Sequence, residues 1–250
     1  MRALGAPPEE RRTLSTTSSG LALALVLTLV AWAQATEPWP SFLPPRVTFP
    51  PVIAAGVERV WRRPTITRRV EGEQAQAPFD LYVALIDAPE VTAAAARHLK
   101  LARYEARRLG DDWYQAEDGA GARGEYHVLV RERTRRVMFS HGSHRGRILG
   151  TITGAALTEI HFEPQGGHVV QGLTAWVLIE NRFVAAMARL LVPLFGQVVD
   201  RKLQEAFRVT ARVAEWAASR PGEFCQWLGQ EPLPAEVRRP VGATVPGCRG

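Results

Sequence analysis

Residues 181–219 read NRFVAAMARLLVPLFGQVVDRKLQEAFRVTARVAEWAAS, and this stretch decides the fold. Apolar residues recur at helical spacing with charged residues in the turns between them, which predicts one long amphipathic helix. Pro193 has no N–H for the carbonyl of Arg189, so we expect a kink or short break there. Pro221 and Gly222 are expected to end the helix. Its apolar stripe is wide enough to cover a sheet, and the upstream strands need such a partner.

The residues before this helix predict a strand, two short helices and a meander of about six strands. Pro78 and Pro89 begin the two short helices, with Asp87 as a cap for the second. Gly154-Ala155 predicts a bulge or bend. The expected segments are helix 52–62, strand 65–70, helices 78–86 and 87–99, strands 104–109, 113–116, 125–132, 136–141, 148–153, 157–162 and 168–179, and a loop at 141–146.

One hairpin in this meander has a predicted register. An even-length loop about Arg133-Thr134 pairs residues 125–132 with residues 136–141. A slip of one residue would mix apolar and polar side chains on both faces, so the alternation favours this pairing. One face then carries Tyr126, Val128, Val130, Val137, Phe139 and His141, and the other carries His127, Arg131 and Arg136.

This order of elements resembles the helix-grip fold of the START/Bet v 1-like (SRPBCC) superfamily, as an exported bacterial-type member. The resemblance covers roughly residues 65–219 and rests on element order and on the strand-to-helix run from Leu173 to Phe207. It implies an α+β fold in which a curved antiparallel sheet wraps around a long C-terminal helix. It also implies an apolar cavity for lipids, sterols, polyketides or similar molecules, and some members are cyclases or aromatases. The N-terminal segments, Pro193 and the C-terminal cysteines depart from common intracellular members, so the ligand class stays open.

The first 35 residues have the pattern of a secretory signal peptide. Arg11 and Arg12 precede an apolar run that ends at Trp32, and small residues follow up to Ala35, where we expect cleavage. The run is short for a membrane span, although an uncleaved anchor is the alternative. We therefore expect a signal peptide (1–35), a Pro- and aromatic-rich lead-in (36–64), a helix-grip domain (65–220) and a C-terminal tail (221–250), in a periplasmic or secreted protein.

The cysteines predict a disulfide, and the charge and motif content argue against nucleic-acid, metal and cofactor sites. Cys225 and Cys248 are the two cysteines, and in an exported protein they predict a disulfide that pins an irregular tail near the helix end. Two separate thiols are the alternative. The net charge of +6 is dispersed and accompanies no nucleic-acid module. We find no metal-ligand spacing, nucleotide fingerprint or phosphate-binding loop, and expect no metal and no cofactor.

The apolar face of the predicted hairpin and two residues of the long helix are the expected ligand-binding residues. The same residues would equally make a solid core, and the family resemblance favours the cavity. A hydrophobic small molecule or lipid is therefore the expected partner, with possible contact to a membrane surface through the hairpin arginines. The expected lining residues are Tyr126, Val128, Val130, Val137, Phe139, His141, Met187 and Leu191.

Two polar pairs suggest other chemistry. His141 and His144 would line a cavity mouth or lie in an ordinary polar loop. Glu159 and His161 lie two apart on one strand, so they suit acid–base work if that face is inward and are a solvated stripe if it is outward. The hypotheses are therefore a carrier of a hydrophobic ligand, an enzyme of the cyclase or hydrolase type on the same fold, or a non-catalytic envelope interaction module.

Overall fold

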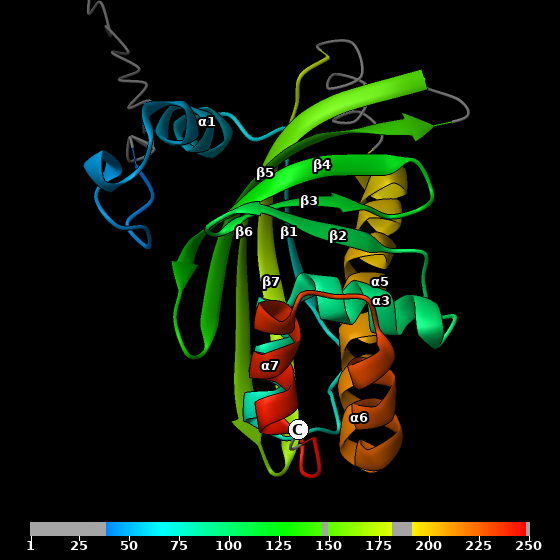
Figure 1. The fold of residues 1–250 in the computed structure, drawn as a ribbon. Helices are drawn as coiled ribbons and strands as arrows, with labels where there is room; N and C mark the ends of the chain where they lie inside the picture. Colours follow the sequence, from blue (N-terminus) through cyan, green and yellow to red (C-terminus); the bar gives the residue numbers. More distant parts are fainter. Residues whose placement is uncertain (1–38, 147–149, 182–191, 249–250) are drawn as a thin grey trace, which may run out of the picture. The chain divides into compact units, whose positions relative to one another are not determined.

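The computed structural model describes residues 39–146, 150–181 and 192–248, without the side chains of residues 192–202. These residues contain a seven-stranded antiparallel sheet of order β1-β7-β6-β5-β4-β3-β2 (Figure 1). β1 pairs with the last strand, and the other strands form a meander. The strands are β1 (Ile66–Glu71), β2 (Glu105–Gly110), β3 (Trp113–Glu117), β4 (Ala122–Arg131), β5 (Arg135–Gly146), β6 (Gly150–Gln165) and β7 (His168–Ile179).

Helices cover both faces of this sheet. α2, α3 and α5 pack on one side, which we call the inner face, and α1 packs on the opposite, outer face. The curved antiparallel sheet with a long helix on its inner face confirms the predicted α+β helix-grip architecture. The helices are η1 (Arg46–Thr48), α1 (Pro51–Arg62), α2 (Phe79–Asp87), α3 (Pro89–His98), α5 (Val192–Ser219), α6 (Pro221–Gln230) and α7 (Ala235–Thr244).

The decisive helix is present from Val192 to Ser219. Phe207 packs against Val70 and Leu173 on the inner face, so its apolar side covers the sheet as predicted. The start of the predicted helix, 182–191, lies outside the described residues, and the expected kink at Pro193 falls at their edge. Asp87 does not cap α3, because the cap residue is Ala88 and makes no side-chain hydrogen bond.

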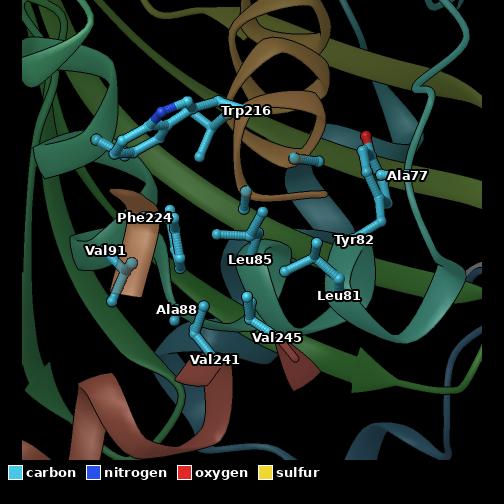
Figure 2. Packing of buried hydrophobic residues seen from close by; sticks show 14 of the residues in the cluster. Ala77, Leu81, Tyr82, Leu85, Ala88, Val91, Trp216, Phe224, Val241 and Val245 are labelled. Carbon is cyan, nitrogen blue, oxygen red and sulfur yellow. The ribbon is translucent and has the colours of Figure 1, made fainter. Parts of the chain in front are cut away.

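The largest apolar cluster joins the C-terminal helices to α2, α3 and α5 (Figure 2). Phe224 of α6 and Val241 of α7 are fully buried beside Leu85 and Val91. The prediction of an irregular tail after Pro221 is therefore wrong. Pro221 begins α6 instead of only ending α5, because proline is well accommodated in the first turn of a helix. Helices α6 and α7 thus contribute buried side chains to the main apolar cluster.

The predicted disulfide is confirmed. Cys225 of α6 and Cys248, beyond α7, are bonded, with their Cα atoms 4.9 Å apart. The bond links α6, which packs on α5, to the residues after α7, which packs on α2. It therefore joins two packed helices, which we call the C-terminal cap, and does not restrain an irregular segment.

The predicted register of the β4–β5 hairpin is wrong for half of its length. Val130 pairs with Val137, but Val128 pairs with Met138, so Leu129 is an extra residue in a bulge. A bulge of one residue exchanges the two faces of the strand beyond it. Tyr126 and Val128 therefore share the inner face with Arg131 and Arg136, whereas Val130, Val137, Phe139 and His141 are on the outer face.

The strands β5 and β6 are longer than expected. Residues 141–146, predicted as a loop, continue β5, and β6 runs through Gly154 without a bulge. Gly124, Gly142 and Gly154 instead pair directly across three strands. A Cβ atom on Gly142 would lie 2.5 Å from the carbonyl oxygen of Arg123, so only glycine permits this close approach of the backbones.

Replacing Gly142 with alanine is therefore expected to lower the free energy of unfolding by about 1–3 kcal/mol, the usual cost of overpacking. Guanidinium chloride unfolding followed by circular dichroism measures this loss. Gly229→Ala is the matched control, because nothing lies within 4 Å of a Cβ there and a helix gains from alanine. A Gly142→Ala protein as stable as wild type would contradict the close approach.

The Pro- and aromatic-rich lead-in docks on the outer face. The ring of Phe42 stacks on Trp176 at 5.3 Å between centroids and meets Trp61 edge-on at 5.6 Å. Leu43 is buried in the same cluster as α1. The aromatic residues of the described part of this arm are thus engaged within the chain.

Candidate functional site

The inner face carries a mainly apolar surface that is incompletely covered. One row of paired residues crosses β4 to β7, namely Tyr126, Ser140, Ala156 and Val177, and the next crosses β4 to β6, namely Val128, Met138 and Thr158. The β7 partner of Thr158, Ala175, is buried and is not counted with them. We call these seven residues the inner patch. Each of them is only partly buried.

The outer face of the same strands is more completely covered than the inner patch. Val137, Phe139, Ala155 and Leu157 alternate with the residues of the inner patch along β5 and β6, and they are 0–5% exposed beneath α1. The described structure therefore leaves apolar surface partly exposed on the inner face.

The structure separates the predicted lining residues into three groups. Tyr126 and Val128 belong to the inner patch. Val130, Val137 and Phe139 fill the solid core under α1, and His141 is exposed on the outer face. Met187 and Leu191 lie outside the described residues. The sequence interpretation missed Met138, Ser140, Ala156, Thr158 and Val177, although the period of two in β5 to β7 places them on one face.

The histidines do not form the predicted pair. His141 and His144 lie within strand β5, on opposite faces, because they are three positions apart and side chains alternate along a strand. His127 lies on the outer face with His141, contrary to the predicted register. Burial lowers the pKa of His127, and the neighbouring His141 lowers it further. In the part of the chain that the structure describes, no group of His, Cys, Asp and Glu side chains is arranged to hold a metal ion.

Glu159 and His161 face outward. Glu159 pairs across the strands with Val137 on the outer face, and its carboxylate contacts Arg135 at 3.2 Å and His161 at 3.4 Å. The outward alternative of the sequence interpretation is therefore the observed one. The pair lies on the opposite face from the inner patch, so it has no access to a ligand bound there.

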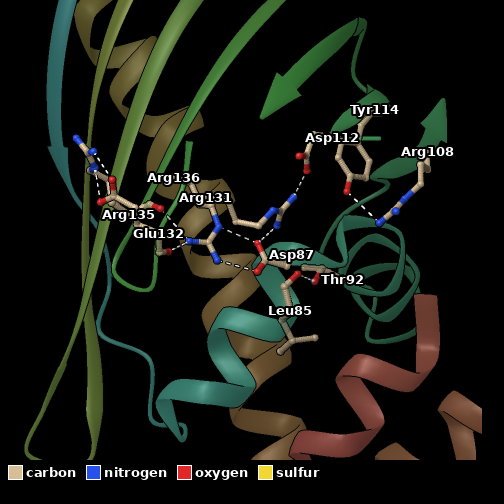
Figure 3. A network of polar contacts seen from close by, with 10 residues as sticks. All are labelled: Leu85, Asp87, Thr92, Arg108, Asp112, Tyr114, Arg131, Glu132, Arg135 and Arg136. Carbon is tan, nitrogen blue, oxygen red and sulfur yellow. Dashed lines mark hydrogen bonds and ion pairs between the residues drawn. The ribbon is translucent and has the colours of Figure 1, made fainter. Parts of the chain in front are cut away.

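A network of ion pairs closes the hairpin end of the inner face (Figure 3). Arg136 is only 3% exposed, and it donates from Nε and one terminal nitrogen to the two oxygens of Asp87, at 2.8 and 2.7 Å. Arg131 contacts both Asp87 and Asp112. Arg133 pairs with Asp80, and Arg135 with Glu132 and Glu159. The four hairpin arginines are thus compensated by carboxylates.

A cleft of about 450 Å³, lined by both charged and apolar residues, opens beside this network. It lies between α2, α7 and strands β2 to β4, with Asp87, Arg108, Tyr114 and Arg131 among its lining residues. The ring of Tyr114 stacks on that of Tyr126, with centroids 5.1 Å apart. These two rings connect the cleft to the inner patch. Burial raises the pKa of both phenols, so both stay protonated and able to donate at neutral pH.

Comparison with family models finds no match, and neither does comparison with curated protein sequences. Solved structures with a similar arrangement include a conserved protein from Geobacillus kaustophilus (11% identity, 60% of this chain and 93% of that one, TM-score 0.40). Ara h 8.0201 matches at 10% identity over 60% and 97% of the chains, TM-score 0.41. The di-domain ARO/CYC protein BexL, from the BE-7585A biosynthetic pathway, matches at 13% identity over 64% and 52%, TM-score 0.42. At these values the function of the chain has to be argued from its own residues.

Proposed function

We propose that the protein binds an apolar, lipid-like molecule between the inner patch and α5, and acts as a carrier outside the cytoplasm. The single observation that supports this is the incomplete burial of the seven inner-patch side chains, beside the four side chains under α1 that alternate with them and are 0–5% exposed. Burial of apolar ligand surface would supply the binding energy, at about 25 cal/mol per Å². Ser140, Thr158 and the tyrosine hydroxyls would orient the polar end of the ligand.

Export is part of the same proposal. The signal-peptide pattern up to Ala35 and the Cys225–Cys248 bond are both typical of proteins that fold in an oxidising compartment. In the described residues, no helix is both long and apolar enough to cross a membrane. We expect the carrier to meet a membrane surface when it collects or delivers its ligand.

Filling the inner patch is the direct test. Ala156 lies at the centre of one row, between Ser140 and Val177. We expect Ala156→Phe to weaken binding of the neutral fluorescent probe N-phenyl-1-naphthylamine at least about tenfold, because the ring would occupy the surface that the probe needs. Fluorescence titration of the full-length protein measures the change.

The matched control is Thr67→Phe, which adds the same ring at an exposed position on the outer face of β1. Its probe affinity should equal that of wild type. Equal affinity in Ala156→Phe, or failure of wild type to bind the probe at all, would contradict the proposed function. Chemical conversion of the bound ligand by the protein would favour the alternative of a cyclase- or hydrolase-type enzyme.

A further inference from the structure

Glu90 is a buried carboxylate without a hydrogen-bond partner among the described residues. It is the second residue of α3 and is 6% exposed. Neither carboxylate oxygen has a donor within hydrogen-bond distance in the described structure. Its recorded ion pair is with Arg108, whose Nε lies 3.8 Å from Oε1, beyond the range of a hydrogen bond.

A series of side-chain contacts connects Glu90 to the inner patch. Arg108 donates instead to the hydroxyl of Tyr114, at 3.1 Å, and that ring stacks on Tyr126. The charge of Glu90 contributes to the raised pKa of both tyrosines, after the larger effect of burial. The carboxylate therefore lies within electrostatic reach of Tyr126, which is a member of the inner patch.

Folding alone does not account for this arrangement. Burying a carboxylate without hydrogen bonds is costly, and the N-terminus of α3 and the ion pair with Arg108 at 3.8 Å offset only part of that cost. Arg108 is 46% exposed and already bonded to Tyr114, so it does not need Glu90 for its own solvation. Unsatisfied buried polar groups of this kind concentrate at functional sites.

We propose that Glu90 accepts a hydrogen bond from a hydroxyl group on the apolar ligand that the inner patch binds. This inference rests on the proposed function and specifies its ligand class. An ionised carboxylate is an acceptor only, so the ligand has to bring a donor. Arg108 compensates part of the charge, which favours a neutral hydroxyl over an ammonium, and Glu90 would repel an anionic ligand.

A matched pair of probes isolates the hydroxyl. 2-Naphthol and 2-methoxynaphthalene have the same rings, and only the first can donate. Hydrogen bonds to charged groups contribute enough to predict that the full-length protein binds 2-naphthol at least about tenfold more tightly. Glu90→Gln should reduce this preference, and Glu90→Leu should abolish it without weakening 2-methoxynaphthalene. The control Glu105→Gln, an exposed carboxylate on neighbouring β2, should keep the full preference.

Thermal unfolding supplies a second measurement. Because Glu90→Leu removes an unsatisfied carboxylate and leaves Arg108 in solvent contact, we expect the melting temperature to rise by about 2–4 °C. A fall would show that Glu90 holds the fold and would overturn the inference. Equal affinity of the wild type for the two probes would also overturn it while leaving the proposed cavity standing. Failure of both probes to bind would instead count against the proposed function itself.

Discussion

Replacing Asp87 with alanine is expected to lower the free energy of unfolding by about 3–5 kcal/mol, the usual cost of leaving a buried charge without its partner. Asp87 accepts two hydrogen bonds from Arg136, which is 3% exposed, and also pairs with Arg131. Arg136 also donates to the backbone carbonyls of Glu132 and Arg135. These carbonyls are neutral, so they cannot balance the charge of Arg136 once Asp87 is removed. Chemical denaturation of the variant measures the loss.

Asp80→Ala is the control for this prediction. Asp80 pairs with Arg133 at 3.0 Å, but both side chains are about 70% exposed, at 69% and 74%. An exposed pair of this kind contributes about 0–1 kcal/mol. The double variant Asp87→Ala/Arg136→Met should recover much of the stability, because it removes the stranded charge together with its partner. Equal, small losses for Asp87→Ala and Asp80→Ala would contradict a buried role for the network.

Removing the disulfide is the second large effect. Cys225 and Cys248 are separated by 23 positions in sequence. Opening a loop of this size is expected to cost about 3 kcal/mol, chiefly by freeing the unfolded chain. We expect Cys225→Ser/Cys248→Ser to show that loss in denaturant unfolding, and reduction of the wild type to reproduce it.

The location of the effect is also predicted. α6 and α7 pack on α2 and α5 through Phe224, Leu228, Val237 and Val241, so their amides should lose hydrogen-exchange protection first. Adding reductant to the double variant should change nothing, which controls for effects of the reagent itself. An unchanged unfolding midpoint in the double variant would mean that packing alone holds the cap.

The order of the elements was predictable because each has its own periodic signal. Apolar residues at helical spacing predicted α5, and the period of two predicted the meander. The bulge at Leu129 was not predicted, because a bulge depends on how two strands pair and not on one strand's propensity. Three consecutive apolar residues, Val128 to Val130, interrupt the alternation there, and they were the available signal. Because the sequence interpretation did not include this bulge, it placed Tyr126 and Val130 on the same face of the sheet.

The C-terminal helices carried a clearer signal. Phe224, Trp227 and Leu228 have helical spacing, as do Val237 and Val241. The prolines before and within this segment suggested irregular structure, although a proline in the first turn favours a helix. Glu90 could not be found from the sequence. An acid in the first turn of a helix is ordinary, and only the structure reveals that its carboxylate is buried without a hydrogen-bond partner among the described residues.

Native mass spectrometry of the protein, expressed with its own N-terminus under conditions that permit export, tests the central claim most directly. We predict one apolar molecule bound per chain, recovered by organic extraction and carrying a hydroxyl group. The mass of the polypeptide should correspond to cleavage near Ala35 with one disulfide formed. A polypeptide that carries nothing, and stays unliganded after incubation with envelope lipids, would contradict the carrier account.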